Sequence, residues 1–429
     1  MLPTDTQAIL LLCASFGQNR QSEPQPLTLR EYNTLAGWLM ENEMSPKNLL
    51  DSNFQKQLPK ITIGKLDSQR LAALLERGVM LSLAVEKWTN QGLWILGRSD
   101  ADYPKRLKQK LKHSAPPILY GVGNVELLSQ GGLAVVGSRD IDEEGLNYTQ
   151  NLVQTCVQEA IQVVSGGARG VDQASMLGAL EAGGTAVGVM ADSLAKAAVA
   201  GKYRSPIKEG RLTLISPYDP SAGFSVGNAM GRNKYIYALS DYALVINSSV
   251  GKGGTWAGAT EALAKIQDVP VFVRKEGKVP PGNYELLKKG AKPFPETPWD
   301  KPLQKILTTA ISEVNPVEES SYPDKDLLNS PEVEEEKTSE VTDNLSSINI
   351  QIGYHPKDIY EAVLPFILEQ LEQPKDDKSL AECLDVKLGQ VRDWLNRAVS
   401  ENKVIKHKKP VSYEVNRSRG LLSLLESGE

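Results

Sequence analysis

Two glycine-rich segments place small residues and an arginine where an apolar run ends. Residues 133–139 read Leu-Ala-Val-Val-Gly-Ser-Arg, and residues 163–172 read Val-Val-Ser-Gly-Gly-Ala-Arg-Gly-Val-Asp. Glycines let a backbone approach a ligand closely, and free N–H groups at the start of a following helix attract anions. Two such segments predict phosphate binding. Neither has the Gly-x-x-x-x-Gly-Lys-Ser/Thr spacing, so a hydrolysed nucleoside triphosphate is a poorer candidate ligand.

Two further segments extend this candidate site. Residues 231–234 read Gly-Arg-Asn-Lys, and residues 251–255 read Gly-Lys-Gly-Gly-Thr after another apolar run. Arginine suits phosphate because its guanidinium offers a fork of hydrogen-bond donors. The predicted DNA- or phosphate-binding residues are Gly137, Ser138, Arg139, Ser165, Gly166, Gly167, Arg169, Gly170, Arg232, Asn233, Lys234, Lys252, Gly253, Gly254 and Thr255.

Several of these features have a purely structural alternative. The favoured role for Asp172 is to cap the helix that follows it; the alternative is a hydrogen bond to the first loop or to a sugar. The sequence 231–234 is either an anion contact at a helix start or a solvated basic turn. Trp256 is expected in the core more often than stacked on a base.

The middle of the chain alternates strand and helix patterns. Apolar, β-branched runs predict strands at residues 118–120, 133–136, 162–164, 186–190, 212–216, 243–246 and 269–273. Helical spacing lies between them, at residues 144–160, 172–182, 233–239 and 257–266. This order predicts an α/β fold with a Rossmann-like, doubly wound, mostly parallel sheet. Ligands of such folds bind at the carboxyl ends of the strands, where both glycine loops fall.

The remaining segments predict further domains. Residues 1–115 are expected to form a helical domain, with a helix-hairpin-helix-like part near 60–80 or plain helical packing there, and residues 116–312 the Rossmann-like core. Residues 313–352 are rich in acidic residues, Ser and Pro and are expected to be a disordered linker. Residues 353–416 combine three helical patterns with two short strands, the outline of a winged helix with a basic hairpin.

Composition narrows the class of protein. The net charge is −5, but residues 313–346 carry eleven acidic and two basic side chains, so the rest of the chain is mildly basic. No apolar run approaches the ~20 residues of a membrane-spanning helix. The three cysteines and three histidines are scattered, which predicts neither a metal site nor a cofactor and favours a reducing, cytoplasmic location.

The motifs, in this order, resemble the DprA (Smf) family of DNA-processing proteins. The family pattern Val-Gly-x-Arg matches residues 136–139, Ser-Gly-x-Ala-x-Gly-Ile-Asp matches 165–172, and Arg-Asn-Arg matches 232–234. Residues 97–107 and 116–124 are similar to the family's entry into its Rossmann-like domain. Departures mark a divergent member: Met176 stands where the family has His, Lys234 replaces the last Arg, and residues 253–258 differ from the family's loop.

The resemblance implies a protein that is not an enzyme and needs no cofactor. Its expected function is to bind and protect single-stranded DNA regardless of sequence, and to load a RecA-type recombinase during DNA uptake and natural transformation. The expected partners are single-stranded DNA, the recombinase and a second copy of the chain in a homodimer, without a membrane. The resemblance carries DNA contact to ten residues of these motifs: Gly137, Ser138, Arg139, Ser165, Gly166, Arg169, Gly170, Arg232, Asn233 and Lys234.

Two other functions compete with this one. Residues 253–255 followed by Glu261 are distantly similar to the glycine loop of nucleotide phosphoribohydrolases of the LOG group, which would make the chain a small-nucleotide sensor or enzyme. Glu261 is too far along for a close match and is expected on a helix surface. A third possibility is an interaction hub that recruits a partner through the acidic segment and the winged helix.

Overall fold

The computed structural model of the chain describes residues 2–17, 24–297, 299, 301–312, 359–371, 373–384, 386, 388–408 and 411–416. The chain divides into two compact units, Met1–Tyr322 and Pro323–Glu429. The linker predicted at 313–352 lies outside the described residues. The finer domain boundaries stay predictions.

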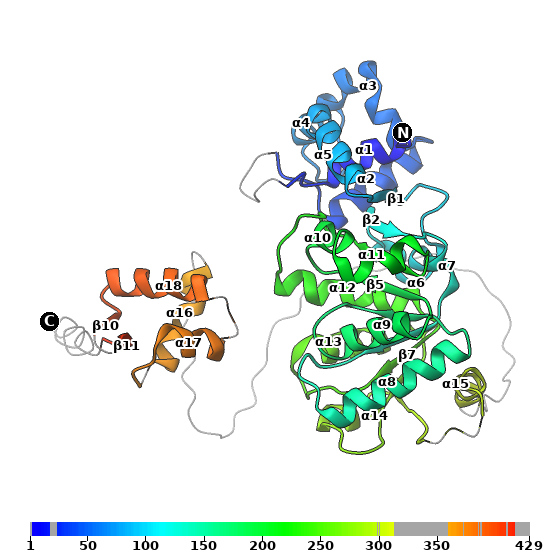
Figure 1. Ribbon diagram of the computed structural model, residues 1–429. Helices are drawn as coiled ribbons and strands as arrows, with labels where there is room; N and C mark the ends of the chain where they lie inside the picture. Colours follow the sequence, from blue (N-terminus) through cyan, green and yellow to red (C-terminus); the bar gives the residue numbers. More distant parts are fainter. Residues whose placement is uncertain are drawn as a thin grey trace, which may run out of the picture. The chain divides into compact units, whose positions relative to one another are not determined.

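Short helices make up the first unit before its sheet begins (Figure 1). They are α1 (Thr4–Cys13), α2 (Leu29–Glu41), α3 (Ser52–Gln57), α4 (Ser68–Leu75) and α5 (Gly78–Asn90), with 3-10 turns η1 (Pro46–Leu50) and η2 (Leu58–Lys60). Tyr32, Leu35 and Leu39 of α2 are buried, as their helical spacing predicts. Trp88 of α5 packs edge-on against Tyr120 of the sheet, with 5.0 Å between ring centroids. One hydrophobic cluster therefore runs from these helices into the sheet.

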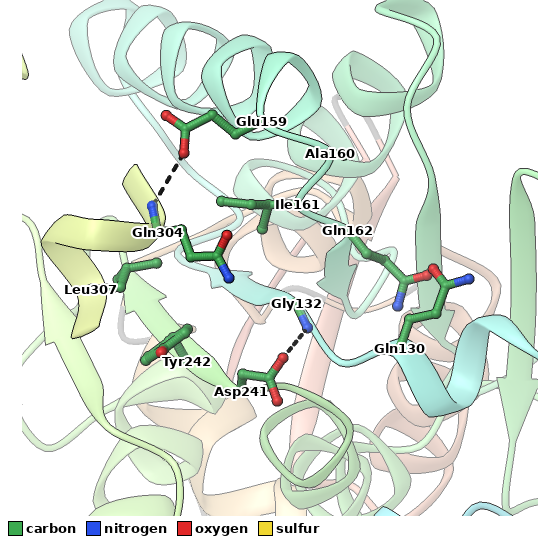
Figure 2. A pocket seen from close by; sticks show the side chains of 10 residues that line it. All are labelled: Gln130, Gly132, Glu159, Ala160, Ile161, Gln162, Asp241, Tyr242, Gln304 and Leu307. Carbon is green, nitrogen blue, oxygen red and sulfur yellow. Dashed lines mark hydrogen bonds between the residues drawn. The ribbon is translucent and has the colours of Figure 1, made fainter. Parts of the chain in front are cut away.

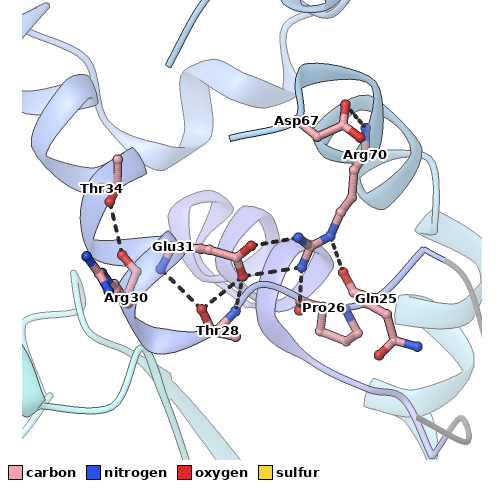
Figure 3. Close-up of polar contacts among 8 residues, drawn as sticks. All are labelled: Gln25, Pro26, Thr28, Arg30, Glu31, Thr34, Asp67 and Arg70. Atoms are coloured by element: carbon pink, nitrogen blue, oxygen red, sulfur yellow. Dashed lines mark hydrogen bonds and ion pairs between the residues drawn. The ribbon is translucent and has the colours of Figure 1, made fainter. Parts of the chain in front are cut away.

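An ion pair fastens α4 to the start of α2 (Figure 3). Arg70 Nη1 lies 2.7 Å from Glu31 Oε1, and the same guanidinium donates to the backbone oxygens of Gln25 and Pro26. Glu31 also completes a capping box with Thr28, the N-cap of α2. The hydrogen bond from Arg70, helped by those from Thr28, holds the pKa of Glu31 at about 2.

Nine strands form one sheet in the order β1-β2-β6-β5-β4-β3-β7-β8-β9. The seven from β3 to β9 pair in parallel, whereas β2 pairs antiparallel with both β1 and β6. All seven predicted strands are present, and β1 and β9 are additional. The strands are β1 (Trp94–Gly97), β2 (Ile118–Gly123), β3 (Leu133–Val136), β4 (Val163–Ser165), β5 (Ala186–Val189), β6 (Leu212–Ser216), β7 (Tyr242–Val245), β8 (Val271–Val273) and β9 (Lys292–Pro293).

Helices cover both faces of the sheet because successive side chains of a strand point to opposite sides. Leu133 and Val135 pack on the face covered by α8 (Glu143–Gln158), α9 (Val171–Glu181) and α15 (Leu303–Ser312). Ala134 and Val136 pack on the face covered by α6 (Lys105–Leu111), α12 (Val226–Leu239), α13 (Gly253–Lys265) and α14 (Pro281–Lys288). The predicted doubly wound, Rossmann-like α/β fold is confirmed. The shorter elements are η3 (Lys112–Ser114), α7 (Leu127–Gln130), α10 (Leu194–Ala198) and α11 (Gly201–Lys208).

Strand β3 lies where the direction of the winding reverses. The chain steps from β3 through β4 and β5 to β6 on one side, and then crosses back to β7 on the other side of β3. Crevices at such points, beyond the carboxyl ends of the strands, are the usual ligand sites of doubly wound folds. The loop after β3 and the loop after β4 both open at this edge.

The second unit is small and has the predicted order of elements. It consists of α16 (Ile359–Gln370), α17 (Asp377–Leu384) and α18 (Leu388–Ser400), followed by the antiparallel strands β10 (Val404–Lys408) and β11 (Val411–Val415). Leu364, Ile367, Leu380, Val391 and Leu395 form its core. Its assignment as a winged helix stays a prediction.

Candidate nucleic-acid interface

The first glycine loop begins where β3 ends and is tied to the end of β7. Ser138 N–H donates to Asn247 Oδ1 at 2.7 Å. A Cβ on Gly137 would overlap the side chain of Val171 and approach Asn247 Oδ1 to 2.7 Å, so only glycine fits this approach. Arg139 extends outward, and its Cζ lies 5.2 Å from the centroid of the Phe224 ring.

The second loop, after β4, packs directly against the first loop. Ser165 is buried and donates its hydroxyl to the backbone oxygen of Val135 at 2.6 Å. Gly170 has a φ of +88°, and a Cβ there would collide with the backbone oxygen of Ser138. Gly167 also has a positive φ, +65°. The two loops therefore form one rigid pair whose spacing depends on glycine at Gly170.

A buried ion pair lies beneath the two loops. Arg232 Nη2 is 3.3 Å from Asp172 Oδ2, and Arg232 Nη1 donates to the backbone oxygen of Val189 at 2.9 Å. The guanidinium occupies the space that a Cβ on Gly166 would fill. Burial raises the pKa of Asp172 and lowers that of Arg232, and each is opposed by the other's charge.

Asp172 does not cap α9, contrary to the favoured sequence prediction. The N-cap of α9 is Gly170, and no side chain caps the helix there. The carboxylate instead accepts hydrogen bonds from the backbone N–H groups of Gly137 and Ala168, one from each loop. Asp172 thus joins both loops to Arg232, which is the alternative that the sequence left open.

Helix α12 begins earlier than the sequence predicts. It starts at Val226, where the Ser225 hydroxyl accepts a hydrogen bond from the N–H of Asn228 at 3.0 Å. The glycines in this first part lower helix propensity, and packing against the neighbouring helices overrides them. The segment 231–234 is therefore mid-helix, and its prediction as a helix start is wrong.

The other polar residues of that segment are also largely withdrawn from solvent. Asn233 is buried and donates to the backbone oxygen of Gly254 at 2.9 Å, which fastens α12 to the third glycine loop. Lys234 is half-buried, with Nζ 5.2 Å from the centroid of the Tyr235 ring, and burial lowers its pKa. Asn233 therefore supports the third glycine loop, whereas Lys234 lies against Tyr235 of its own helix.

The third glycine loop forms the start of α13. Lys252 is the N-cap of this helix without a side-chain capping bond, and the helix begins with Gly253, Gly254 and Thr255. Gly253 has a φ of +81° with no atom near the position of a Cβ. Trp256 is partly buried and packs against the hydrophobic core, the favoured prediction.

Two arginines of the set point into solvent at this edge. Arg139 is exposed, and Arg169 forms only an exposed ion pair with Asp140, at 2.6 Å with side chains 75% and 87% exposed. A pair this open is easily exchanged for another anion. The structure thus brings the first two loops, Arg232 and Asn233 together, with Arg139 and Arg169 as the outward cations.

Exposed apolar side chains border the loops, and none of them is predicted in the sequence analysis. Phe224 is 54% exposed beside Arg139, and Met230 is 37% exposed near the start of α13. Val226 and Val250 are also exposed on neighbouring segments. The sequence signal that could have identified them is an apolar residue inside an otherwise polar loop, as in residues 221–226.

A cavity lies at the opposite edge of the sheet, by the amino ends of β3 and β7 (Figure 2). It measures about 150 Å³. Its two carboxylates are engaged with backbone N–H groups: Asp241 accepts from Gly132 at 2.8 Å, and Glu159 accepts from Leu303 at 2.7 Å and Gln304 at 3.2 Å. These bonds fasten α15 and the turn before β3, which is a structural role.

The described part of the chain contains neither a cluster of metal ligands nor a membrane-spanning helix. No three His, Cys, Asp or Glu side chains among these residues are grouped as metal ligands. None of its helices has the length and apolar character needed to cross a bilayer.

A family model described as DNA recombination-mediator protein A matches residues 94–301. Residues 94–301 therefore match the DprA/Smf family, and the match is limited to this part of the chain. The match contains every predicted site residue and all nine strands of the sheet. It favours a DNA-processing protein over the nucleotide-hydrolase alternative. Glu261, the catalytic candidate of that alternative, lies on α13 and pairs with Lys265 at 3.2 Å.

Individual DprA/Smf proteins match parts of the chain. The DNA processing protein DprA of Streptococcus pneumoniae is 35% identical over 82 residues, 19% of this chain and 29% of that protein. Protein Smf of Synechocystis is 29% identical over 161 residues, 36% of this chain and 39% of that protein. The chain therefore spans less than half the length of either relative.

A solved structure of the family has the same fold. The X-ray structure of DprA from Streptococcus pneumoniae aligns with a TM-score of 0.53 and 19% identity, covering 72% of this chain and 98% of that one. At this identity the likeness concerns the fold alone.

Proposed function

We propose that the chain binds single-stranded DNA without regard to sequence and acts as a recombination mediator. The observation that carries this proposal is the pair of locked glycine loops at the winding reversal, with Arg139 and Arg169 left in solvent. The family's description as a DNA recombination-mediator supports it. Phosphates are the ligand that this chemistry suits, because guanidinium groups and backbone N–H groups hold phosphate oxygens.

The arginines of the site have two separate roles in this proposal. Arg139 and Arg169 contact the DNA backbone directly. Arg232 acts as a positioning residue, because its guanidinium is already bonded to Asp172 and Val189 beneath the loops. Its loss would let the loops shift and would weaken DNA binding indirectly.

Exposed apolar groups beside the cations favour single strands over duplex. Unpaired bases offer flat faces that stack on aromatic and apolar side chains, and bases within a duplex do not. Phe224 and Met230 supply such surfaces next to Arg139 and the third loop. Because no base-edge donor pattern is assembled here, affinity depends on the phosphates and on salt.

Fluorescence anisotropy with a labelled oligo-dT, titrated across salt beside a duplex of equal length, tests the proposal. We expect salt-sensitive binding that favours the single strand. Arg139→Ala or Arg169→Ala should lower the affinity and reduce the salt slope by roughly 0.7 per lost phosphate contact. Arg30→Ala, which removes an exposed charge from α2, is the matched control and should change neither.

Two results would overturn the proposal. One is the absence of oligo-dT binding at low salt, and the other is unchanged affinity in both site variants with the fold intact. Stabilisation by a free nucleotide, in a protein that ignores oligo-dT, would instead support the small-nucleotide function.

The proposal has four further parts. They are loading of a RecA-type recombinase, protection of incoming strands in natural transformation, a homodimer and a cytoplasmic location. If the chain loads a recombinase onto DNA, we expect it to shorten the lag before recombinase filaments form on DNA coated with single-strand-binding protein. Light scattering of the full chain measures the dimer. An unchanged lag would remove the loading role and leave DNA binding intact.

A further inference from the structure

A buried arginine lies one strand away from the DNA loops, and the function above does not use it. Arg274 directly follows β8 and is 2% exposed. Its Nη2 donates to the backbone oxygen of Lys278 at 2.8 Å. Within the described residues, Nε and Nη1 have no hydrogen-bond partner, and no ion pair includes this guanidinium.

A tyrosine from α8 lies against this guanidinium. Arg274 Cζ is 5.2 Å from the centroid of the Tyr148 ring. The Tyr148 hydroxyl is itself buried without a partner among the described residues. Burial raises the pKa of Tyr148, so its hydroxyl keeps its proton and remains a donor.

Two elements therefore bring unused donors close together in the protein interior. Buried donors normally find an acceptor. Neither nearby acidic side chain forms an ion pair with Arg274: Glu144 accepts from the N–H of Lys278 at 2.9 Å, and Glu276 accepts from the N–H of Thr297 at 2.9 Å. An oxyanion is the kind of group that would satisfy both donors.

We propose that Arg274 and Tyr148 form a second anion site, which holds a phosphate group. Phosphate suits it because its several oxygens can accept both from the guanidinium and from the tyrosine hydroxyl. The site takes either free phosphate or a phosphate of a bound strand.

The segment 275–280 covers this site and provides the way in. Lys275, Gly277 and Lys278 are exposed, and Gly277 turns the backbone with a φ of +70°. One hydrogen bond from Lys278 N–H to Glu144 holds the segment against α8. Displacing this segment would uncover the buried guanidinium of Arg274, with the exposed Lys275 and Lys278 on the same segment.

Asn283 connects the proposed site with the first glycine loop. Its Nδ2 donates to the backbone oxygens of Arg274 at 2.8 Å and Ile246 at 3.0 Å, and its Oδ1 accepts from Ser248 N–H at 2.8 Å. Between Ile246 and Ser248, in the segment that follows β7, Asn247 accepts a hydrogen bond from the N–H of Ser138. An anion bound at Arg274 would therefore act on residues 246–248, which position the first glycine loop.

Thermal unfolding of the full chain in inorganic phosphate, against chloride at equal ionic strength, tests the site. We expect phosphate to raise the Tm by about 2–4 °C, because a ligand that binds only the folded state stabilises it. Arg274→Met should abolish the rise, and Tyr148→Phe should reduce it. Arg30→Ala, which removes an exposed charge from α2 and touches neither anion site, should keep it.

The source of the phosphate is decided by a second arm. If a bound strand supplies it, Arg274→Met also weakens oligo-dT binding and phosphate competes with the strand; if free phosphate supplies it, oligo-dT affinity is unchanged. A Tm that ignores phosphate, or an equal rise in wild type and Arg274→Met, would overturn the proposal. Should Arg274→Met not fold, an undiminished rise in both Arg274→Lys and Tyr148→Phe overturns it instead.

Discussion

Arg232 Nη2 and Asp172 Oδ2 lie 3.3 Å apart on two different helices, and both side chains are less than a tenth exposed. The pair joins α12 to α9 beneath both glycine loops. An arginine from a basic motif thus contacts protein rather than solvent, and the loops that it supports carry the outward cations.

Removing one partner of this pair should cost more than removing both. Arg232→Met leaves Asp172 buried without its counter-charge and should lower the free energy of unfolding by about 3–5 kcal/mol. Asp172→Asn should cost less, because an amide oxygen still accepts from Gly137 and Ala168. Chemical denaturation of both variants and the double variant measures the coupling, and simple additivity would show that the pair does not act as a unit.

Gly170→Ala should disrupt the loops, whereas Gly183→Ala should not. The two glycines have nearly equal φ, +88° and +87°, but a Cβ on Gly170 would collide with Ser138 and a Cβ on Gly183 would meet nothing. We expect about 1–2 kcal/mol for the left-handed backbone at either position, and about 1–3 kcal/mol more at Gly170. Unfolding curves and oligo-dT affinity of both variants provide the check, and equal effects would contradict the close approach.

Asp140→Asn should strengthen DNA binding. The carboxylate competes with phosphate for Arg169, and both side chains are mostly exposed. We expect about a two- to threefold gain in oligo-dT affinity at low salt, with the free energy of unfolding changed by less than about 0.5 kcal/mol. Glu143→Gln, an equal change of charge at the first turn of α8, is the control. If both substitutions raise the oligo-dT affinity equally, the gain comes from the change in net charge and not from the release of Arg169.

Glu31→Gln should remove part of the acid sensitivity of the first unit. The folded pKa of Glu31 is lowered to about 2, so its ion pair stabilises fully above the unfolded value near 4.3 and is lost as the pH falls toward 2. After allowance for partial exposure we expect a contribution of about 1–2 kcal/mol. Unfolding free energies at pH 6 and pH 3 measure it, with Glu86→Gln as an exposed control. A variant that stays as acid-sensitive as wild type would contradict this role.

Strands were the most predictable part of the fold. Buried parallel strands are continuous β-branched runs, so residues 133–136 and 212–216 could be placed to the residue. Strand β9 is two residues long and leaves no such run. Helix α12 was shortened in the prediction because Gly227 and Gly231 indicate a loop locally, and only tertiary packing makes that segment helical.

The position of the candidate site could be predicted from the sequence, but not which of its residues face the ligand. Glycine spacing placed the loops correctly, because a strand end and a helix start fix their position. Which cations face outward depends on side-chain directions on two loops and on helix α12, so Arg139 and Arg232 were indistinguishable in sequence. Arg274 could not be foreseen, because a lysine- and arginine-containing turn after a strand normally indicates a solvated surface.

The contact of Trp88 with Tyr120 indicates which surface would be exposed if the amino-terminal helices were removed. The amino-terminal helices and β1 cover β2 on its face and along its edge. A fragment beginning at residue 116 would turn β2 into an open edge strand beside a bare apolar face, the combination that recruits other chains by strand addition. Such a fragment should therefore aggregate, even though it keeps the whole parallel part of the sheet.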